Sequence, residues 1–232
     1  MNIFWRLVLA HLLTDFTLQT NFIARWKREN IWGGLVHSII FFVSGAAICW
    51  ESLHSIWFNL GNVVILNGWA AIAILTFFHF LEDEWRVWTI KKLNSPDSFV
   101  FFLWDQCIHY VLIFVFSPQY ANAYPEKIIL YAILFILTTH FTSIFVFYME
   151  KGIYGQAMLP GREKYYSIAE RTVAGLLLLL PGLQALNILF LVPIRIIVHR
   201  IWKDHGFSWV NVVVGSIMGI VFGLFARLIY YA

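Results

Sequence analysis

The sequence predicts an all-α membrane protein, a polytopic bundle of transmembrane helices, on two observations. Hydrophobic residues make up 60% of the 232 residues and charged residues only 12%, whereas soluble domains carry about 25% charged residues. The apolar residues also gather in long segments, most of them near the ~20 residues that a helix needs to cross a bilayer. These segments lie at 3–24, 31–50, 62–90, 98–117, 127–150, 167–180, 184–202 and 208–230. They predict a single integral membrane domain over residues 1–232, with no soluble domain.

The segments predict eight helices, with seven as the alternative. The first segment lacks the basic stretch and the small-residue cleavage site of a signal peptide, so it is expected to be a retained helix. The segments at 167–180 and 184–202 are the shortest, and Pro181-Gly182 lies between them. This dipeptide indicates either a tight turn between two short spans or a kink inside one broken helix.

The basic residues predict the orientation of the chain. Lys and Arg gather in alternate connections, at 25–30, 84–97, 150–166 and 195–203, and are nearly absent from the others. The positive-inside rule places these connections in the cytoplasm and both chain ends on the outer side. The net charge of only +3 gives no indication of a nucleic-acid partner.

Three pairs of histidine and aspartate with i, i+4 spacing lie inside the apolar segments. They are His11 with Asp15, His79 with Asp83, and Asp105 with His109. On a helix this spacing places both side chains on one face, one turn apart. Because ionisable groups at membrane depth are costly, they usually face a bundle interior and mark a functional site.

The three pairs and His37 are expected at one depth. With a rise of 1.5 Å per residue, they fall about 9–21 Å from the predicted cytoplasmic ends of their four helices. This agreement predicts a metal site in the cytoplasmic half of the membrane. Its candidate ligands are His11, Asp15, His37, His79, Asp83, Asp105 and His109.

Imidazole and carboxylate ligands favour zinc, with iron or manganese as alternatives. Seven candidates exceed one tetrahedral zinc site, so either two ions bind or some aspartates only orient the histidine rings. Asp15 and Asp105 are the candidate catalytic residues. The alternative is a metal-free polar network that locks the helices together.

Three further residues are candidates for substrate binding. Gln19 continues the stripe of His11 and Asp15 by one turn and is expected to bind a substrate oxygen or to hydrogen-bond between helices. His140 is a candidate outer ligand or proton shuttle, with a hydrogen-bonded core histidine as the alternative. Arg171, at the start of a helix, is a candidate for receiving an anionic head group. Gln106 and Cys107 are expected to point away from the site.

The motifs HLLTDFTLQTNFIARWK from residue 11, HFLEDEWR from residue 79 and DQCIHY from residue 105 are similar to those of domain-of-unknown-function family 3307, a family of small bacterial membrane proteins. That family's pattern resembles H-x3-D-x3-Q-T, a lone His, H-x2-I-D and D-Q-x2-H. Glu170-Arg171, Arg195 and Gly215-Ser216 resemble its C-terminal half. The resemblance implies a bacterial inner-membrane protein and the same candidate residues, but no reaction. Glu82 stands where the family has an apolar residue, which leaves open whether Glu82 or Asp83 faces the site.

Together these observations predict a membrane-embedded metal-dependent enzyme, leaning to a hydrolase of a lipid or lipid-linked substrate. The predicted site lies inside the membrane, and no soluble domain is available to capture a polar substrate. A metal-ion or proton transporter is the alternative, although its polar residues would be expected along the whole bilayer depth. A di-iron lipid oxidase and a purely structural or partner-binding protein are further alternatives.

Overall fold

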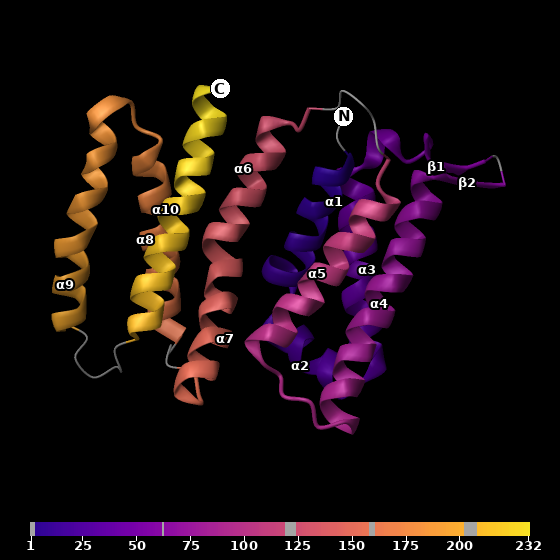
Figure 1. Cartoon of the computed structure of the whole chain (residues 1–232), viewed down its shortest axis with the longest axis horizontal. Helices are drawn as coiled ribbons and strands as arrows, with labels where there is room; N and C mark the ends of the chain where they lie inside the picture. The colour runs from indigo at the N-terminus through magenta and orange to yellow at the C-terminus, as the bar shows by residue number, and fades with distance from the viewer. Residues whose placement is uncertain (1–2, 62, 119–123, 158–160, 202–207) are drawn as a thin grey trace. The chain divides into compact units, whose positions relative to one another are not determined.

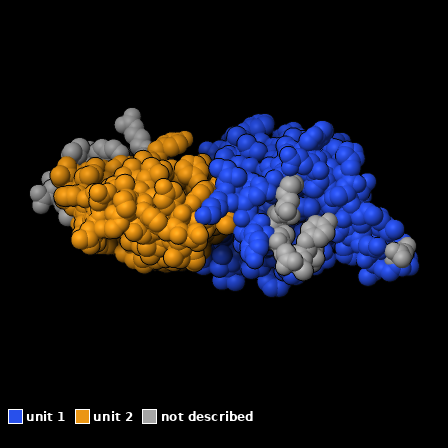
Figure 2. Space-filling view, turned by 90° about the horizontal axis from the view of Figure 1, so that it is seen from above, with its two compact units in different colours: residues 1–129 blue, residues 130–232 orange. Residues whose placement is uncertain are grey.

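The computed structural model describes residues 3–61, 63–118, 124–157, 161–201 and 208–232. These residues form helices, short connections and one β-hairpin, which confirms the predicted all-α class (Figure 1). The chain divides into two compact units, residues 1–129 and residues 130–232 (Figure 2). Each unit is described by itself.

The first unit is built around four helices that pack in a closed circuit. Its elements are α1 (Ile3–Leu12), the π-helical η1 (Leu13–Leu18), α2 (Asn21–Glu29), α3 (Ile31–Ile48), the 3-10 turn η2 (Trp50–Ser52), β1 (Ile56–Leu60), β2 (Val64–Asn67), α4 (Gly68–Lys92) and α5 (Phe99–Phe116). Helix α3 packs against α1 and α4, and α5 packs against α4 and α1. Apolar side chains such as Leu12, Phe41 and Ile72 fill the interior between these helices.

Capping side chains explain where the helices of this unit begin. The hydroxyl of Thr20 accepts a hydrogen bond from the amide of Ile23, and the side chain of Asn30 accepts one from Trp32. These caps satisfy amide groups that a helix leaves free at its start. They divide the expected first helix at 3–24 into α1 with η1 and a separate α2. The expected segment at 62–90 likewise begins later, at Gly68, because the antiparallel hairpin β1–β2, which was not predicted, takes the residues before it.

The second unit contains helices that pack around α8 and α10. Its elements are α6 (Lys127–Ile136), which starts at the boundary between the units, η3 (Leu137–Phe141), α7 (Thr142–Tyr154), α8 (Gly161–Leu178), η4 (Gly182–Phe190), α9 (Leu191–Ile201) and α10 (Trp209–Tyr231). Helix α10 packs against α8 and α7. A Cβ on Gly223 would lie 2.7 Å from Leu178 Cδ1, so glycine permits the close approach of α8 and α10.

Pro181-Gly182 forms a turn between two helical segments. Helix α8 ends at Leu178, and Gly182 has a φ of +54°, a conformation that favours glycine. Segment η4 then packs back against α8. The structure therefore has the predicted turn and not a kink inside one helix.

Four of the described helical segments are long and apolar enough to cross a membrane, which indicates an integral membrane protein. They are Ile31–Ile48, Phe99–Phe116, Lys127–Tyr154 and Trp209–Tyr231. The number of eight spans and the orientation of the chain ends stay predictions. Residues 158–160 and 202–207, which belong to two of the basic connections, lie outside the described residues.

Candidate metal centre

The seven predicted ligands lie together in the interior of the first unit. They come from α1, η1, α3, α4 and α5, and each is at most 7% exposed to solvent. Six of them, together with Glu82, form two adjoining groups, and His11 lies beside Asp15 and His79. We call Asp15, His37, His79 and Asp83 the four-residue cluster, and Glu82, Asp105 and His109 the three-residue cluster. The ring centroids of His79 and His109 are 4.4 Å apart, so the two clusters are neighbours.

The nitrogen–oxygen distances in the four-residue cluster are compatible with a bound metal ion. His37 Nε2 lies 3.2 Å from Asp15 Oδ1 and 3.4 Å from Asp83 Oδ2. His79 Nε2 lies 3.6 Å from each of the same two oxygens. All four atoms are buried and have no hydrogen-bond partner. Ligand atoms around a zinc ion with bonds of 2.0–2.2 Å lie about 3.3–3.6 Å apart, which is close to these four nitrogen–oxygen distances.

The three-residue cluster also leaves its ligand atoms without partners. His109 Nε2 lies 3.4 Å from Glu82 Oε2, and neither atom has a hydrogen bond. Asp105 Oδ1 and the second oxygen of Glu82 are buried and unpartnered too. Glu82 and Asp83 therefore both face the interior, each in its own cluster. Three of the described residues contribute possible ligand atoms here, fewer than the four of a closed structural site.

The backbone determines which nitrogen of His109 carries a proton. His109 Nδ1 lies 2.9 Å from the carbonyl oxygen of Asp105. Because a carbonyl only accepts, Nδ1 is the donor, and the neutral ring presents a lone pair at Nε2. That lone pair faces the carboxyl group of Glu82. Histidine ligands of metals are commonly oriented by such an outer hydrogen bond.

Gln106 determines the proton position of His11 in the same way, which corrects the expectation that it points away. Its amide Nε2 donates to Asp105 Oδ2 at 3.0 Å and to Asp15 Oδ2 at 3.3 Å. Its Oε1 therefore accepts from His11 Nε2 at 3.2 Å. The lone pair at His11 Nδ1 is left without a hydrogen bond, 3.8 Å from Asp15 Oδ1.

A small cavity lies against these rings. Its volume is about 10 Å³, and the rings of His11, His79 and His109 line it together with Phe41. This is close to the space that one water molecule needs. The cavity therefore places a water-sized space beside histidines of both clusters.

Two basic side chains that the sequence analysis did not assign to the site support the carboxylates. Lys27 Nζ donates to Asp83 Oδ1 at 2.8 Å, and Arg86 Nη1 donates to Asp105 Oδ2 at 2.8 Å. In each case the base holds one carboxylate oxygen and leaves the other for the interior. Burial lowers the pKa of Lys27, but neighbouring carboxylates, chiefly Asp83, outweigh burial and raise the pKa overall. Both basic residues lie in predicted cytoplasmic connections, and the positive-inside rule alone had explained their presence there.

A π-helical turn carries Asp15. Segment η1 spans Leu13–Leu18, and the hydroxyl of Thr14 donates to the carbonyl of Ala10 at 2.9 Å. A π turn inserts an extra residue, so it changes which side chains share a helix face, and such turns are frequent at functional sites. Here it aims Asp15 at His37 on α3.

A close helix contact brings Lys27 to the four-residue cluster. A Cβ on Gly33 would lie 2.4 Å from the backbone nitrogen of Lys27 and 2.4 Å from the carbonyl carbon of Trp26. We expect Gly33→Ala to push α2 away from α3 and to lower the free energy of unfolding by about 1–3 kcal/mol. Gly152→Ala is the matched control, because nothing lies within 4 Å of the added Cβ. Equal thermal stability of the two variants in detergent would contradict this packing.

The remaining candidates are placed as follows. Gln19 lies at the end of η1, and its buried Oε1 has no hydrogen-bond partner. His140 and Arg171 belong to the second unit, where His140 Nδ1 lies 3.0 Å from the hydroxyl of Thr139. Their roles in substrate binding stay predictions. Cys107 is exposed and free, as expected.

Fold and site together define a helical membrane protein with buried histidine and carboxylate clusters that can hold a metal ion. Residues 3–136 match the model of the family described as "Protein of unknown function (DUF3307)", and the chain belongs to this family. The match includes every residue of both clusters and confirms the resemblance of the three motifs that begin at residues 11, 79 and 105, whereas the resemblance at Glu170-Arg171, Arg195 and Gly215-Ser216 lies outside it and stays a prediction. Comparisons with curated proteins and with solved structures found no match.

Proposed function

We propose that this protein is a membrane-embedded metal-dependent enzyme, a hydrolase of a lipid or lipid-linked substrate. The observation that carries the proposal is the meeting of unpartnered atoms at two places, one inside the three-residue cluster and one between His11 and Asp15 of the four-residue cluster. The lone pair of His109 faces Glu82, and the lone pair of His11 faces Asp15. Buried polar atoms without partners are costly, and acceptors that face each other also repel. A cation between them removes both costs.

A metal-free network would need protons in the same places. Protons on His11 and His109 would add two buried charges beside Lys27 and Arg86, and the carboxyl groups of Asp15, Asp83, Asp105 and Glu82 lie in the same interior to offset them. Each additional buried charge carries a desolvation penalty of several kcal/mol. One metal ion can serve several of the unpartnered atoms at once, whereas a proton joins only two of them, and this difference favours metal ions.

The two clusters suit different tasks. Asp15, His37, His79 and Asp83 supply four ligands, the number found in closed structural sites. The three-residue cluster supplies fewer ligands, and its His109 lines the water-sized cavity. There we assign ligand roles to Asp105 and His109, and proton acceptance to Glu82, whose two oxygens are both without hydrogen bonds. The proposed roles thus move the general base from Asp15 and Asp105 to Glu82.

The side chains around Asp105 and Glu82 define the chemistry that we propose for the site. Arg86 and Gln106 hold Asp105 in place by hydrogen bonds to the same oxygen. Zinc, our proposed metal, would act as a Lewis acid and would generate a nucleophile from water at neutral pH. Glu82 would take the proton from that water. The reaction class is therefore hydrolysis of an ester or phosphoester.

Lipid turnover by the purified protein tests this proposal. In nanodiscs of bacterial polar lipids with added zinc, we expect release of fatty acid or phosphorylated head group, detected by mass spectrometry. Glu82→Gln is expected to reduce the rate by about 10²–10⁴-fold, because the general base is lost.

Glu51→Gln is the matched control, since Glu51 is an exposed acid in η2. We expect this variant to keep full activity. No turnover by the metal-loaded wild type, or an unchanged rate in Glu82→Gln, would contradict the hydrolase. Ion uptake into liposomes that requires Asp83 and Asp105 would assign transport to the site in its place.

A further inference from the structure

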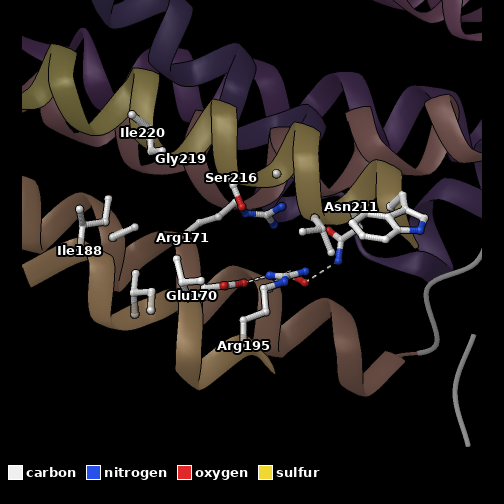
Figure 3. Close-up of a pocket in the computed structure, with 15 residues that line it drawn as sticks. Glu170, Arg171, Ile188, Arg195, Asn211, Ser216, Gly219 and Ile220 are labelled. Atoms are coloured by element: carbon white, nitrogen blue, oxygen red, sulfur yellow. Dashed lines mark hydrogen bonds and ion pairs between the residues drawn. The ribbon is translucent and has the colours of Figure 1, made fainter. Parts of the chain in front are cut away.

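The second unit contains a large cavity between α8, α9 and α10. Its volume is about 570 Å³, within the usual range for sites that bind small ligands. Most of its lining is apolar, with side chains such as Ile188, Leu191 and Ile220 (Figure 3). Arg171 and Asn211 bring polar groups to it from α8 and α10. The cavity is therefore amphipathic.

The guanidinium of Arg171 is buried and incompletely hydrogen-bonded. The residue is only 3% exposed. Its Nη2 donates to the hydroxyl of Ser143 at 2.7 Å and to the carbonyl of Thr139 at 3.2 Å. Its Nε and Nη1 have no hydrogen-bond partner. Gly215 leaves room beside Nη1, because a Cβ there would lie 3.2 Å away.

The charges that line the cavity do not balance. Glu170 forms an ion pair with Arg195, so these two lining residues neutralise each other (Figure 3). Arg171 is left with the carbonyl and hydroxyl groups of Thr139 and Ser143, which carry no charge. An uncompensated buried cation is strongly unfavourable, and charge-assisted hydrogen bonds from Arg suit a phosphate or carboxylate. An anion bound in the cavity would therefore compensate the charge of Arg171.

The exposed residues at the rim of the cavity indicate where the anion comes from. Trp209, Val192 and Ile220 line the cavity and are 65%, 58% and 41% exposed. Two of them belong to α10, a helix long and apolar enough to cross a membrane. An apolar rim on such a helix borders hydrocarbon, so a free phosphate ion would have to cross it without compensation.

We propose that this cavity binds an acidic membrane lipid. Arg171 contacts the anionic head group, and the apolar walls from η4, α9 and α10 hold part of an acyl chain. Asn211 also lines the cavity, and its buried Oδ1 has no hydrogen-bond partner. The site lies wholly in the second unit, and the proposal does not rest on metal binding or on hydrolysis.

Lipid retention by the full-length protein tests this site. The protein is purified in detergent, supplied with phosphatidylglycerol or phosphatidylcholine, and analysed by native mass spectrometry. We expect one phosphatidylglycerol to be retained and phosphatidylcholine to bind at least about tenfold more weakly. Arg171→Gln is expected to weaken phosphatidylglycerol binding by about tenfold to a hundredfold, the usual effect of losing charged hydrogen bonds.

Arg227→Gln is the matched control, because Arg227 of α10 donates to the carbonyl of Leu178 and lies outside the cavity lining. If Arg171→Gln fails to fold, Val192→Trp narrows the rim and leaves Arg171 in place, and the same loss is expected. Undiminished retention of phosphatidylglycerol in the folded variant would overturn the proposal. Inorganic phosphate that displaces the lipid at millimolar concentration would overturn the lipid assignment and leave an anion site. Metal content and turnover, measured on the same samples, report on the first unit separately.

Discussion

Replacing His79 with alanine is expected to abolish metal binding in the four-residue cluster. His79 belongs to two of the three ligand groups, with His11 and Asp15 and with His37 and Asp83. Loss of a residue that merely orients a ligand costs about 10–100-fold in metal affinity, so loss of this shared ligand should cost at least as much. We expect one or two equivalents of metal in the wild type. In His79→Ala the four-residue cluster should keep less than about a tenth of its metal.

Elemental analysis of protein purified without a polyhistidine tag measures this difference. His54→Ala is the matched control, because His54 lies between η2 and β1 and its ring faces Trp69, with 6.3 Å between ring centroids. This variant should keep the full metal content. If wild type and His79→Ala are both free of metal under these conditions, the clusters form a protonated polar network and the enzyme proposal falls.

The i, i+4 spacing and the shared depth predicted which residues meet, because both follow from helix geometry alone. His37 is the clearest case: no partner lies near it in sequence, yet it lies between Asp15 and Asp83. The spacing did not predict the partners themselves. His109 pairs through its side chain with Glu82 on α4, and with Asp105 only through the backbone. Partners across helices depend on tertiary packing, which the spacing within one helix does not contain.

The errors also have physical causes. Gln106 was expected to point away because it adjoins Asp105, but the interior is wide enough for neighbouring positions of α5 to face it. The positive-inside rule alone accounted for Lys27, because this residue lies beyond the first apolar segment. It reaches Asp83 only because Thr20 starts a new helix and Gly33 lets that helix pack against α3. The helix start at Thr20 and the close contact at Gly33 depend on the course of the backbone. The composition of the sequence does not reveal them.

The ion pair between Lys27 and Asp83 should dominate the stability of the metal-free protein. Both side chains are largely buried, at 14% and 3% exposed, and the atoms are 2.8 Å apart. Asp83→Ala leaves the ammonium group buried without its carboxylate, a change that typically costs about 3–5 kcal/mol. Adding Lys27→Met removes the uncompensated charge, so the double variant should regain about 1–3 kcal/mol. Unfolding in mixed micelles, with a chelator present, measures each free energy.

A neighbouring basic residue separates this effect from general damage to α2. Arg28 is on the same helix, its side chain is 59% exposed, and it lies 3.7 Å from Asp97. Because exposed pairs contribute about 0–1 kcal/mol, Arg28→Met should cost far less than Asp83→Ala. Metal adds a second distinction: at 100 times the Kd it should stabilise the wild type by about 2.7 kcal/mol and leave Asp83→Ala nearly unchanged. Equal stabilisation of both would show that Asp83 is only a partner of Lys27, and the metal would then be held without it.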